Sequence, residues 1–149
     1  MMRTARATDG ELLETIHRAA FGDAQSWSAA FIVSQMELPG TFAILEEAGG
    51  FILARCILEQ AEILTLAVAP GSRRRGVASG LLALMLVRVT DLGARAVFLE
   101  VSERNAPAQA LYRAHGYTQV GTRPGYYDDG AAALVMSLAL GNASPITGS

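Results

Sequence analysis

The sequence predicts an α/β fold, in which a mixed and mostly antiparallel sheet of seven strands is flanked by about four helices. Three observations support this prediction. Apolar residues recur with a helical period in some segments and form short, strand-like runs in others. Three consecutive strand segments are separated only by short polar turns, which favours antiparallel pairing. The chain has 149 residues, of which 51% are hydrophobic, and this is enough to bury one core.

The N-terminal part of the chain predicts one short strand and two helices. The strand is expected over residues 2–7. Thr8 or Asp9 can cap the first helix, because their side-chain oxygens accept hydrogen bonds from free backbone N–H groups. Apolar residues then recur at helical spacing, namely Leu12, Leu13, Ile16 and Ala20. The second helix is predicted to begin at Ser28 and to end before Pro39-Gly40.

The middle of the chain changes to strand character. Strands are expected over residues 41–45, 51–58 and 62–68, and the short turns between them predict a meander. A helix is predicted over residues 76–92, because apolar side chains recur there in steps of three and four. Gly93 is suited to end this helix, since glycine readily adopts the conformation that closes a helix.

The last third of the chain alternates strand and helix. A strand over residues 96–101 is apolar on both faces, as expected at the centre of a sheet. A helix is predicted over residues 107–115, with Asn105 or Ala106 as its cap and Gly116 at its end. The alternation of strands with crossover helices requires parallel as well as antiparallel pairs, which is why we expect a mixed sheet.

Strands over residues 117–121 and 132–140 complete the predicted sheet. We expect a single domain over residues 1–140 and a flexible tail over residues 141–149, which are rich in Gly, Ser, Pro and Thr. The N-terminus shows no apolar signal core, and no apolar run reaches the roughly 18 residues that a membrane span needs. The expected location is therefore cytoplasmic.

Composition and charge exclude several classes of function. The net charge of -2 gives no basic surface for bulk nucleic acid, so no direct nucleic-acid partner is expected. The single cysteine, Cys56, excludes a disulfide framework or a multi-cysteine zinc site, and it is interpreted as a buried strand residue. His17 and His115 lack companions at metal-ligand spacing and are interpreted as surface or helix-end residues, so no metal is expected.

One loop has the residues of an anion site. Arg73-Arg74-Arg75-Gly76-Val77-Ala78 connects a predicted core strand to a predicted amphipathic helix. The first turn of a helix leaves N–H groups without intrahelical partners, and together with the helix dipole these favour a phosphate. Gly76 allows close approach of the backbone, Ala78 keeps the next contact small, and arginines can reach peripheral phosphates. The alternative is that the three arginines are only solvated loop residues.

This loop resembles the acetyl-CoA motif of the GNAT superfamily, Gln/Arg-x-x-Gly-x-Gly/Ala, which Arg73, Gly76 and Ala78 match. The resemblance implies acetyl-CoA as co-substrate. It also implies a splayed pair of central strands over residues 63–68 and 96–101, with the pantetheine arm between them. Free backbone groups of Leu66, Ala67 and Val68 are then expected to hold that arm.

Glu100 and Tyr112 are the candidate base and acid. Glu100 interrupts an apolar strand, and a carboxylate there costs free energy unless it is paired, hydrated or used. An amine acceptor is largely protonated at neutral pH, so a base is needed before it can attack a thioester. Tyr112 shares a helix face with Ala108, Leu111 and His115, and its hydroxyl could protonate a departing thiolate. The alternatives are a salt-bridged strand-end glutamate and a core aromatic; Asn105 can be a plain helix cap or a cap that also contacts the cofactor.

A closer resemblance, over most of residues 2–140, is to the bacterial RimI-type ribosomal-protein alanine N-acetyltransferases. It rests on these residues: Trp27-Ser28 with Phe31, Glu62 to Val68, Leu99-Glu100-Val101, Asn105, Ala110-Leu111-Tyr112, Gly116-Tyr117, Arg123 and Tyr126-Tyr127. The resemblance implies that Glu100 is the base and Tyr112 the acid. It implies acetyl-CoA contacts from Leu66, Ala67, Val68, Arg74, Arg75, Gly76, Val77, Ala78, Ser79 and Asn105.

The acceptor side is less well defined by the sequence. Tyr126 and Tyr127 could wall the acceptor pocket or could belong to a packed turn. Trp27 could contact the acceptor, although a staple between the two N-terminal helices is the favoured interpretation. The loop over residues 128–133 is shorter and less polar than is usual in the RimI-type family, and the chain has no docking extension after its last strand. Both differences concern the identity of the acceptor.

The expected activity is direct transfer of an acetyl group to the N-terminal amine of a protein. The resemblance implies that the acceptor is the N-terminal alanine of a small-subunit ribosomal protein. The alternatives are an acetyltransferase for a small-molecule amine or lysine, and a non-catalytic module that only binds acetyl-CoA. No membrane partner is expected, and the chain is expected to be a monomer or a weak dimer.

Overall fold

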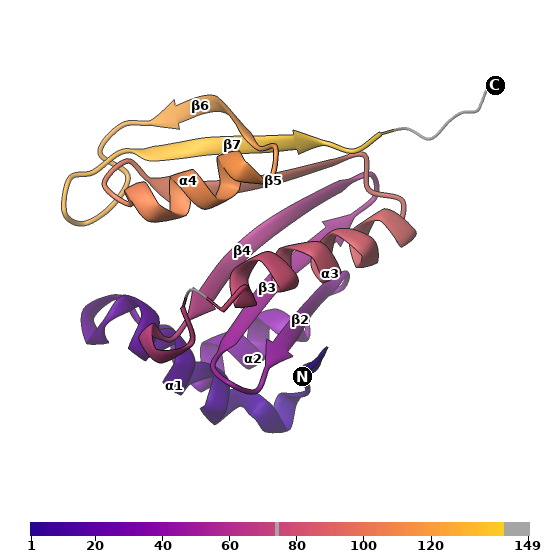
Figure 1. Ribbon diagram of the computed structural model, residues 1–149, viewed down its shortest axis with the longest axis vertical. Coiled ribbons are helices and arrows are strands. Elements are labelled where there is room, and N and C mark those ends of the chain that lie inside the picture. The colour runs from indigo at the N-terminus through magenta and orange to yellow at the C-terminus, as the bar shows by residue number, and fades with distance from the viewer. Residues whose placement is uncertain (74, 142–149) are drawn as a thin grey trace.

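The computed structural model describes residues 1–73 and 75–141 as one twisted sheet with helices on both faces (Figure 1). The strands are β1 (Met2–Thr4), β2 (Thr41–Glu46), β3 (Gly50–Ile57), β4 (Gln60–Val68), β5 (Ala96–Ser102), β6 (Thr118–Arg123) and β7 (Ala133–Ala139). The helices are α1 (Gly10–Phe21), α2 (Ala29–Met36), α3 (Val77–Asp91) and α4 (Ala106–Ala114). Three short 3-10 turns, Ala7–Asp9, Asp23–Gln25 and Pro70–Ser72, connect them. The predicted order of elements is confirmed; Arg74 and the predicted tail from residue 142 lie outside the described residues.

Two of the helix starts follow the predicted capping chemistry. The first helix does not, because Asp9 stands at its cap position but makes no side-chain capping bond to α1; its Oδ2 accepts from the Arg6 N–H instead. The Ser28 hydroxyl accepts a hydrogen bond from the Phe31 N–H at 3.1 Å and thereby caps α2. Asn105 caps α4 in the same way, because its Oδ1 accepts from the Ala108 N–H at 3.1 Å. Each cap satisfies one N–H that the first helical turn cannot pair internally.

The sheet runs in the order β1-β2-β3-β4-β5-β7-β6. The β2–β3–β4 meander is antiparallel, as predicted. The one parallel pair in the described sheet joins β4 to β5, and its register covers only Gln60–Ala96, Ala61–Val97 and Glu62–Phe98. Beyond Glu62 the two central strands separate, which confirms the predicted splay.

A β-bulge lies where the strands separate. Leu53 pairs with Thr65 and Ala54 pairs with Ile63, so Leu64 is the extra residue in β4. A bulge bends its strand and increases the local twist. Here the bend falls directly after the last parallel pair, so it turns the end of β4 away from β5.

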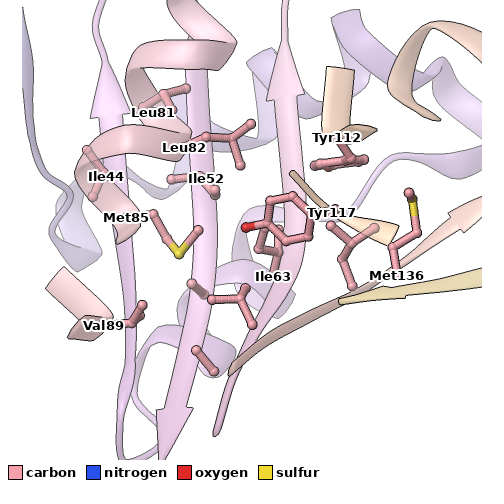
Figure 2. Close-up of a cluster of buried hydrophobic side chains, with 14 of the residues drawn as sticks. Ile44, Ile52, Ile63, Leu81, Leu82, Met85, Val89, Tyr112, Tyr117 and Met136 are labelled. Atoms are coloured by element: carbon pink, nitrogen blue, oxygen red, sulfur yellow. The ribbon is translucent and has the colours of Figure 1, made fainter. Parts of the chain in front are cut away.

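The helices divide into two layers around two cores. α1 and α2 cover one face of β2 to β4, where Leu13, Ile32 and Phe51 are fully buried. α3 covers the other face, and its cluster continues across the split to β5, β7 and α4. Figure 2 shows this second cluster, with labelled side chains Ile44, Ile52, Ile63, Leu81, Leu82, Met85, Val89, Tyr112, Tyr117 and Met136.

Two further predictions concern the thiol of Cys56 and the presence of membrane-spanning helices. Cys56 is buried in β3, as predicted, and burial raises the pKa of its thiol. Among the described residues, none of the helices is long and apolar enough to cross a membrane.

Candidate active site

The turn that leads into α3 has the backbone of an anion site. β4 ends at Val68, and the 3-10 turn Pro70–Ser72 carries the chain to the start of α3. Gly76 has φ of 74°, in the left-handed region that favours glycine. A Cβ at Gly76 would meet no atom of the described residues within 4 Å apart from its chain neighbours, so the space beside the turn is open to a ligand. The N–H groups of the first turn of α3 have no intrahelical partner and are available to that ligand.

A cavity of about 220 Å³ lies at this turn. Its lining comes from the end of β4, the connecting loop, the first turn of α3 and α4, namely Val68, Ser72, Arg73, Gly76, Val77, Ala78, Ser79 and Leu111. Six of these residues belong to the predicted acetyl-CoA site, and the sequence analysis missed Ser72 and Leu111. Leu111 could have been found from its position next to Tyr112 on a predicted helix face. The loop, with its open glycine and free N–H groups, fits a phosphate-bearing group.

Arg73 holds the loop in place through the backbone. Its Nε donates to the Val68 carbonyl at 3.1 Å, and one terminal nitrogen donates to the Ala20 carbonyl near the end of α1 at 3.3 Å. The predicted site residue therefore braces the end of β4 and also lines the cavity. Arginine has five N–H donors in a fixed fork, so further donors remain for a ligand.

Two more contacts fix the turn to neighbouring elements. The buried Ser72 hydroxyl donates to the Ala48 carbonyl at 2.7 Å, which fastens the loop to the β2–β3 turn. Ser79 Oγ lies 3.0 Å from His115 Nε2, which joins the first turn of α3 to the last turn of α4. His115 is thus a helix-end residue, as predicted. The predicted anion site thus lies on a braced loop between β4 and α3, and α4 contacts the first turn of α3.

Glu100 lies on β5 and forms an ion pair with Arg123 at the end of β6. The Glu100 side chain is 24% exposed, so it is partly shielded but reached by water. Arg123 also lies over the Tyr126 ring, with 5.7 Å from the guanidinium carbon to the ring centroid. The salt-bridged interpretation of Glu100 is therefore correct as a description of its contacts. Arg123 was missed as a site residue, although it precedes Tyr126 by three positions in the sequence.

Tyr112 is buried on the inner face of α4. Its ring packs edge-on against Tyr117, with 5.7 Å between centroids. Burial, then the neighbouring Tyr117 and Tyr127, raises the pKa of Tyr112 well above its usual range. The phenol therefore keeps its proton at neutral pH, which a proton donor requires.

Tyr126 and Tyr127 occupy different environments. Tyr126 is 52% exposed, whereas Tyr127 is half-buried, and their rings meet edge-on at 5.1 Å. Burial raises the pKa of Tyr127, and the negative charge of Glu100 contributes to the rise. Tyr127 also contributes to the raised pKa of Tyr112. Tyr127 thus lies close enough to interact with both the candidate base and the candidate acid.

His17 contradicts its predicted surface position. It is 2% exposed, on the same face of α1 as Leu13 and Ile16. Burial lowers the pKa of His17 to about 4, so the ring is neutral at pH 7. The absence of companions at metal-ligand spacing excludes a metal site but does not place the side chain, and the spacing of four from Leu13 puts His17 on the buried face of α1.

Trp27 packs between α1 and α2, as the staple interpretation predicted. Its ring stacks on His17 at 4.9 Å and meets Phe31 of α2 edge-on at 5.0 Å.

A second cavity, of about 820 Å³, lies elsewhere, at the tip of the β3–β4 hairpin and beside β5. It is lined by Arg55, Ile57, Leu58, Glu59, Gln60, Ala61, Glu62 and Phe98. This cavity shares no residue with the anion site.

Among the described residues, the remaining predicted acetyl-CoA contacts do not line the cavity. Leu66 packs toward α3, whereas the side chain of Ala67 is fully buried toward α1, so only its backbone can face the split. Arg75 is exposed on the loop, and Asn105 acts as the cap of α4. Arg74 cannot be placed, because it lies outside the described residues.

Comparisons with known proteins agree with this geometry. Residues 11–117 match the model of the Acetyltransferase (GNAT) family. The ribosomal protein bS18-alanine N-acetyltransferase of Haemophilus ducreyi is 33% identical over 94 residues, which cover 60% of this chain and 65% of that protein. The N-alpha-acetyltransferase of Sulfurisphaera tokodaii is 28% identical over 156 residues, which cover 93% of this chain and 92% of that protein. The match thus spans just under two thirds of the first relative and nearly all of the second.

A solved structure shares the whole fold. The crystal structure of the ribosomal-protein-S18-alanine N-acetyltransferase from Escherichia coli superposes with a TM-score of 0.85 at 26% identity. The superposition covers 97% of this chain and 96% of that chain. The split sheet, the glycine turn before α3 and the family match over residues 11–117 have one explanation: this chain belongs to the GNAT family of acetyltransferases.

Proposed function

We propose that this chain is an acetyl-CoA-dependent N-alpha-acetyltransferase, and that its acceptor is the N-terminal alanine of a small-subunit ribosomal protein. The observation that carries the donor half is the 220 Å³ cavity at the glycine turn, where free N–H groups of α3 meet the end of β4 and Leu111 of α4. The acceptor half is supported by the relatives, two of which are named as alanine N-acetyltransferases of ribosomal protein S18.

The donor site uses the backbone more than side chains. The first turn of α3 binds the pyrophosphate of acetyl-CoA through N–H groups and the helix dipole. Acetyl-CoA supplies the acetyl group as a thioester. Beyond Glu62, β4 has no β5 partner, so the backbone of Leu66 and Val68 is available at the split. An N–H there polarises the thioester carbonyl as charge develops on its oxygen.

The acid and base act on opposite sides of the transfer. Glu100 takes the proton that the acceptor amine loses, through a water molecule, and Arg123 holds the carboxylate in position. Tyr112 donates its phenolic proton to the departing thiolate, and its raised pKa keeps that proton available at neutral pH. Tyr127 lies near both groups and supplies a hydroxyl toward the acceptor backbone.

A peptide panel tests the proposal. Purified protein is incubated with acetyl-CoA and peptides that begin with Ala, with the same peptides blocked at the N-terminus but carrying free lysines, and with small amines. Release of CoA and mass-spectrometric mapping of the acetyl group should show modification of the α-amine of the Ala-starting peptides. Preferential modification of lysine or of a small amine would overturn the acceptor. Binding of acetyl-CoA without turnover on any amine would overturn the enzymatic role.

A further inference from the structure

A buried histidine connects β4 to the segment that leads into α2. His17 Nδ1 lies 3.1 Å from the Trp27 backbone nitrogen, and His17 Nε2 lies 3.2 Å from Thr65 Oγ1. A backbone N–H can only donate, so Nδ1 is the acceptor in the first bond. In a neutral imidazole the other nitrogen then carries the proton, so Nε2 donates to the Thr65 hydroxyl. The two bonds fix a single tautomer.

The two hydrogen-bond partners of His17 lie in different elements: Thr65 in β4, just after the bulge, and Trp27 in the segment before α2. Thr65 follows the bulge residue Leu64 and immediately precedes the Leu66 to Val68 segment of β4. β5 no longer pairs with β4 at this point, so β4 has a strand partner on one side only, namely β3. Trp27 lies at the start of the segment that leads into α2, on the opposite side of His17. A side-chain bond to Thr65 therefore replaces part of the support that β5 does not give.

The packing around His17 makes the connection rigid. The imidazole stacks on Trp27 and meets the rings of Phe21 and Phe51 at 4.5 Å and 6.2 Å between centroids. Arg73 connects α1 to the phosphate loop through the Ala20 carbonyl. α1 is thus bonded to β4 just after the bulge and to the loop that lines the donor cavity.

We infer that His17 is a positioning residue, which holds the Trp27 segment at a set distance from the bulge in β4 and thereby sets the acceptor side against the acetyl donor. The inference rests on the proposed function, together with the prediction from the sequence that Trp27 also contacts the acceptor. His17 does not reach the reacting atoms. It acts through Trp27 and Thr65, and loss of either bond should loosen acceptor binding while leaving the donor cavity intact.

The test uses the full chain and three variants. His17→Gln places an amide near the Nε2 position, so it can reach Thr65 but offers no acceptor to the Trp27 N–H. Thr65→Val keeps the shape of the side chain and removes the hydroxyl. Thr65→Ser keeps the hydroxyl and serves as the matched control. Steady-state kinetics with an Ala-starting peptide, calorimetric binding of acetyl-CoA and thermal unfolding are measured for each protein.

His17→Gln and Thr65→Val should each raise the KM for the peptide by roughly tenfold, because each leaves one buried polar group without its partner. The kcat and the Kd for acetyl-CoA should change by less than about twofold, and Thr65→Ser should behave as the wild type. An unchanged KM in both variants overturns the inference. A parallel loss of peptide and acetyl-CoA binding also overturns it, since that indicates a general structural role.

Fluorescence gives a second readout that does not depend on turnover. Trp27 is the only tryptophan of the chain, so its emission reports on this segment alone. The emission maximum should shift to longer wavelength in His17→Gln and Thr65→Val and stay unchanged in Thr65→Ser. If the wild type acetylates no peptide, the proposed function is wrong, and the emission still decides whether the connection exists. An unshifted maximum in both variants shows that it does not.

Discussion

Single residues of the candidate site differ most in how far water reaches them. Tyr112 is buried, Glu100 is partly exposed beside Arg123, and Tyr126 is mostly exposed. Burial of a phenol disfavours its charged form, so Tyr112 holds its proton more tightly than a free tyrosine does. A carboxylate that keeps contact with water can exchange protons with it. These environments suit the acid role for Tyr112 and the base role for Glu100.

The first prediction concerns Tyr112. Tyr112→Phe should lower kcat for peptide acetylation by about 100-fold, because general acid catalysis contributes roughly 10²-fold or more. The Kd for acetyl-CoA should stay within about twofold, since the change removes one hydroxyl and leaves the ring in place. Tyr117→Phe is the matched control, since Tyr117 is a buried neighbour to which no role is assigned, and its kcat should be that of the wild type. Equal kcat values for both variants would remove Tyr112 from the mechanism.

The second prediction concerns His17 and pH. The folded pKa of His17 is lowered from 6.5 to about 4, so the unfolded chain binds a proton in this range that the folded chain does not. The stability is therefore fully present above pH 6.5 and is lost as the pH falls toward 4. Between pH 7.5 and pH 5 the free energy of unfolding should fall by about 2 kcal/mol through this residue. Urea unfolding at the two pH values measures the fall.

His17→Gln separates this effect from the carboxylates. The variant has no group that titrates at position 17, so its free energy of unfolding should change less between pH 7.5 and pH 5 than that of the wild type. Asp9, held by Arg3, has a pKa lowered to about 2 and loses its contribution only at lower pH. Identical pH dependence in both proteins would show that His17 is not the residue responsible.

At the scale of elements, the proposed donor site depends on how β4 leads into α3. β4 leaves β5 after Glu62, bends at Leu64 and ends at Val68, where Arg73 holds its carbonyl. α3 then begins behind a left-handed Gly76. The order of bulge, brace and glycine aims the first turn of α3 at the cavity.

The third prediction concerns Gly76. Gly76→Ala places a Cβ on a backbone with φ of 74° and should destabilise the fold by about 1 kcal/mol or more. Relaxation of the turn moves the N–H groups of α3, so the Kd for acetyl-CoA should rise roughly tenfold. Gly71→Ala is the control, because Gly71 has no positive φ and open space around it. Calorimetry and thermal unfolding measure both effects, and a normal Kd in Gly76→Ala would contradict the assignment of the turn.

At the scale of the whole molecule, two halves meet at the split. The first half holds β1 to β4 with α1 to α3, and the second holds β5 to β7 with α4 (Figure 1). The two halves share one strand pair, β4 and β5, with only three paired residues on each strand, so much of their connection comes from the buried cluster in Figure 2. A gap in hydrogen bonding at the centre of the sheet is thus compatible with a continuous core.

The fourth prediction concerns this core. Leu99 of β5 is 2% exposed and belongs to the cluster that spans both halves. Leu99→Ala should lower the free energy of unfolding by about 2–5 kcal/mol, because it removes buried methyl groups and leaves a cavity. Leu58→Ala is the control, since Leu58 is 87% exposed and its truncation should change stability by less than about 0.5 kcal/mol. Chemical unfolding followed by circular dichroism measures both, and a small effect at Leu99 would show that the halves do not share this core.

Much of the fold and of the donor site could be predicted from local signals. Ser28 and Asn105 cap helices where the sequence indicated, because a cap depends on residues only three positions apart. Gly76 was predicted at the turn because a strand, a glycine and a helix follow one another along the chain. The acceptor side was less predictable. Arg123 of β6 and Glu100 of β5 form an ion pair across β7, and no pattern of neighbouring residues in the sequence predicts this pair.

By itself, the sequence determined the seven strands, the four helices, the glycine turn and the order of the elements, since each follows from period, caps and breakers over a few residues. The split of the sheet was expected only from the resemblance to the GNAT superfamily. Only the tertiary structure decided that His17 is buried between Trp27 and Thr65, that Arg73 braces Val68, and that Glu100 pairs with Arg123. The physical reason is the distance along the chain over which each kind of interaction acts. Hydrophobic periodicity acts along one element, whereas these contacts join residues from different elements and exist only after the helices have packed on the sheet.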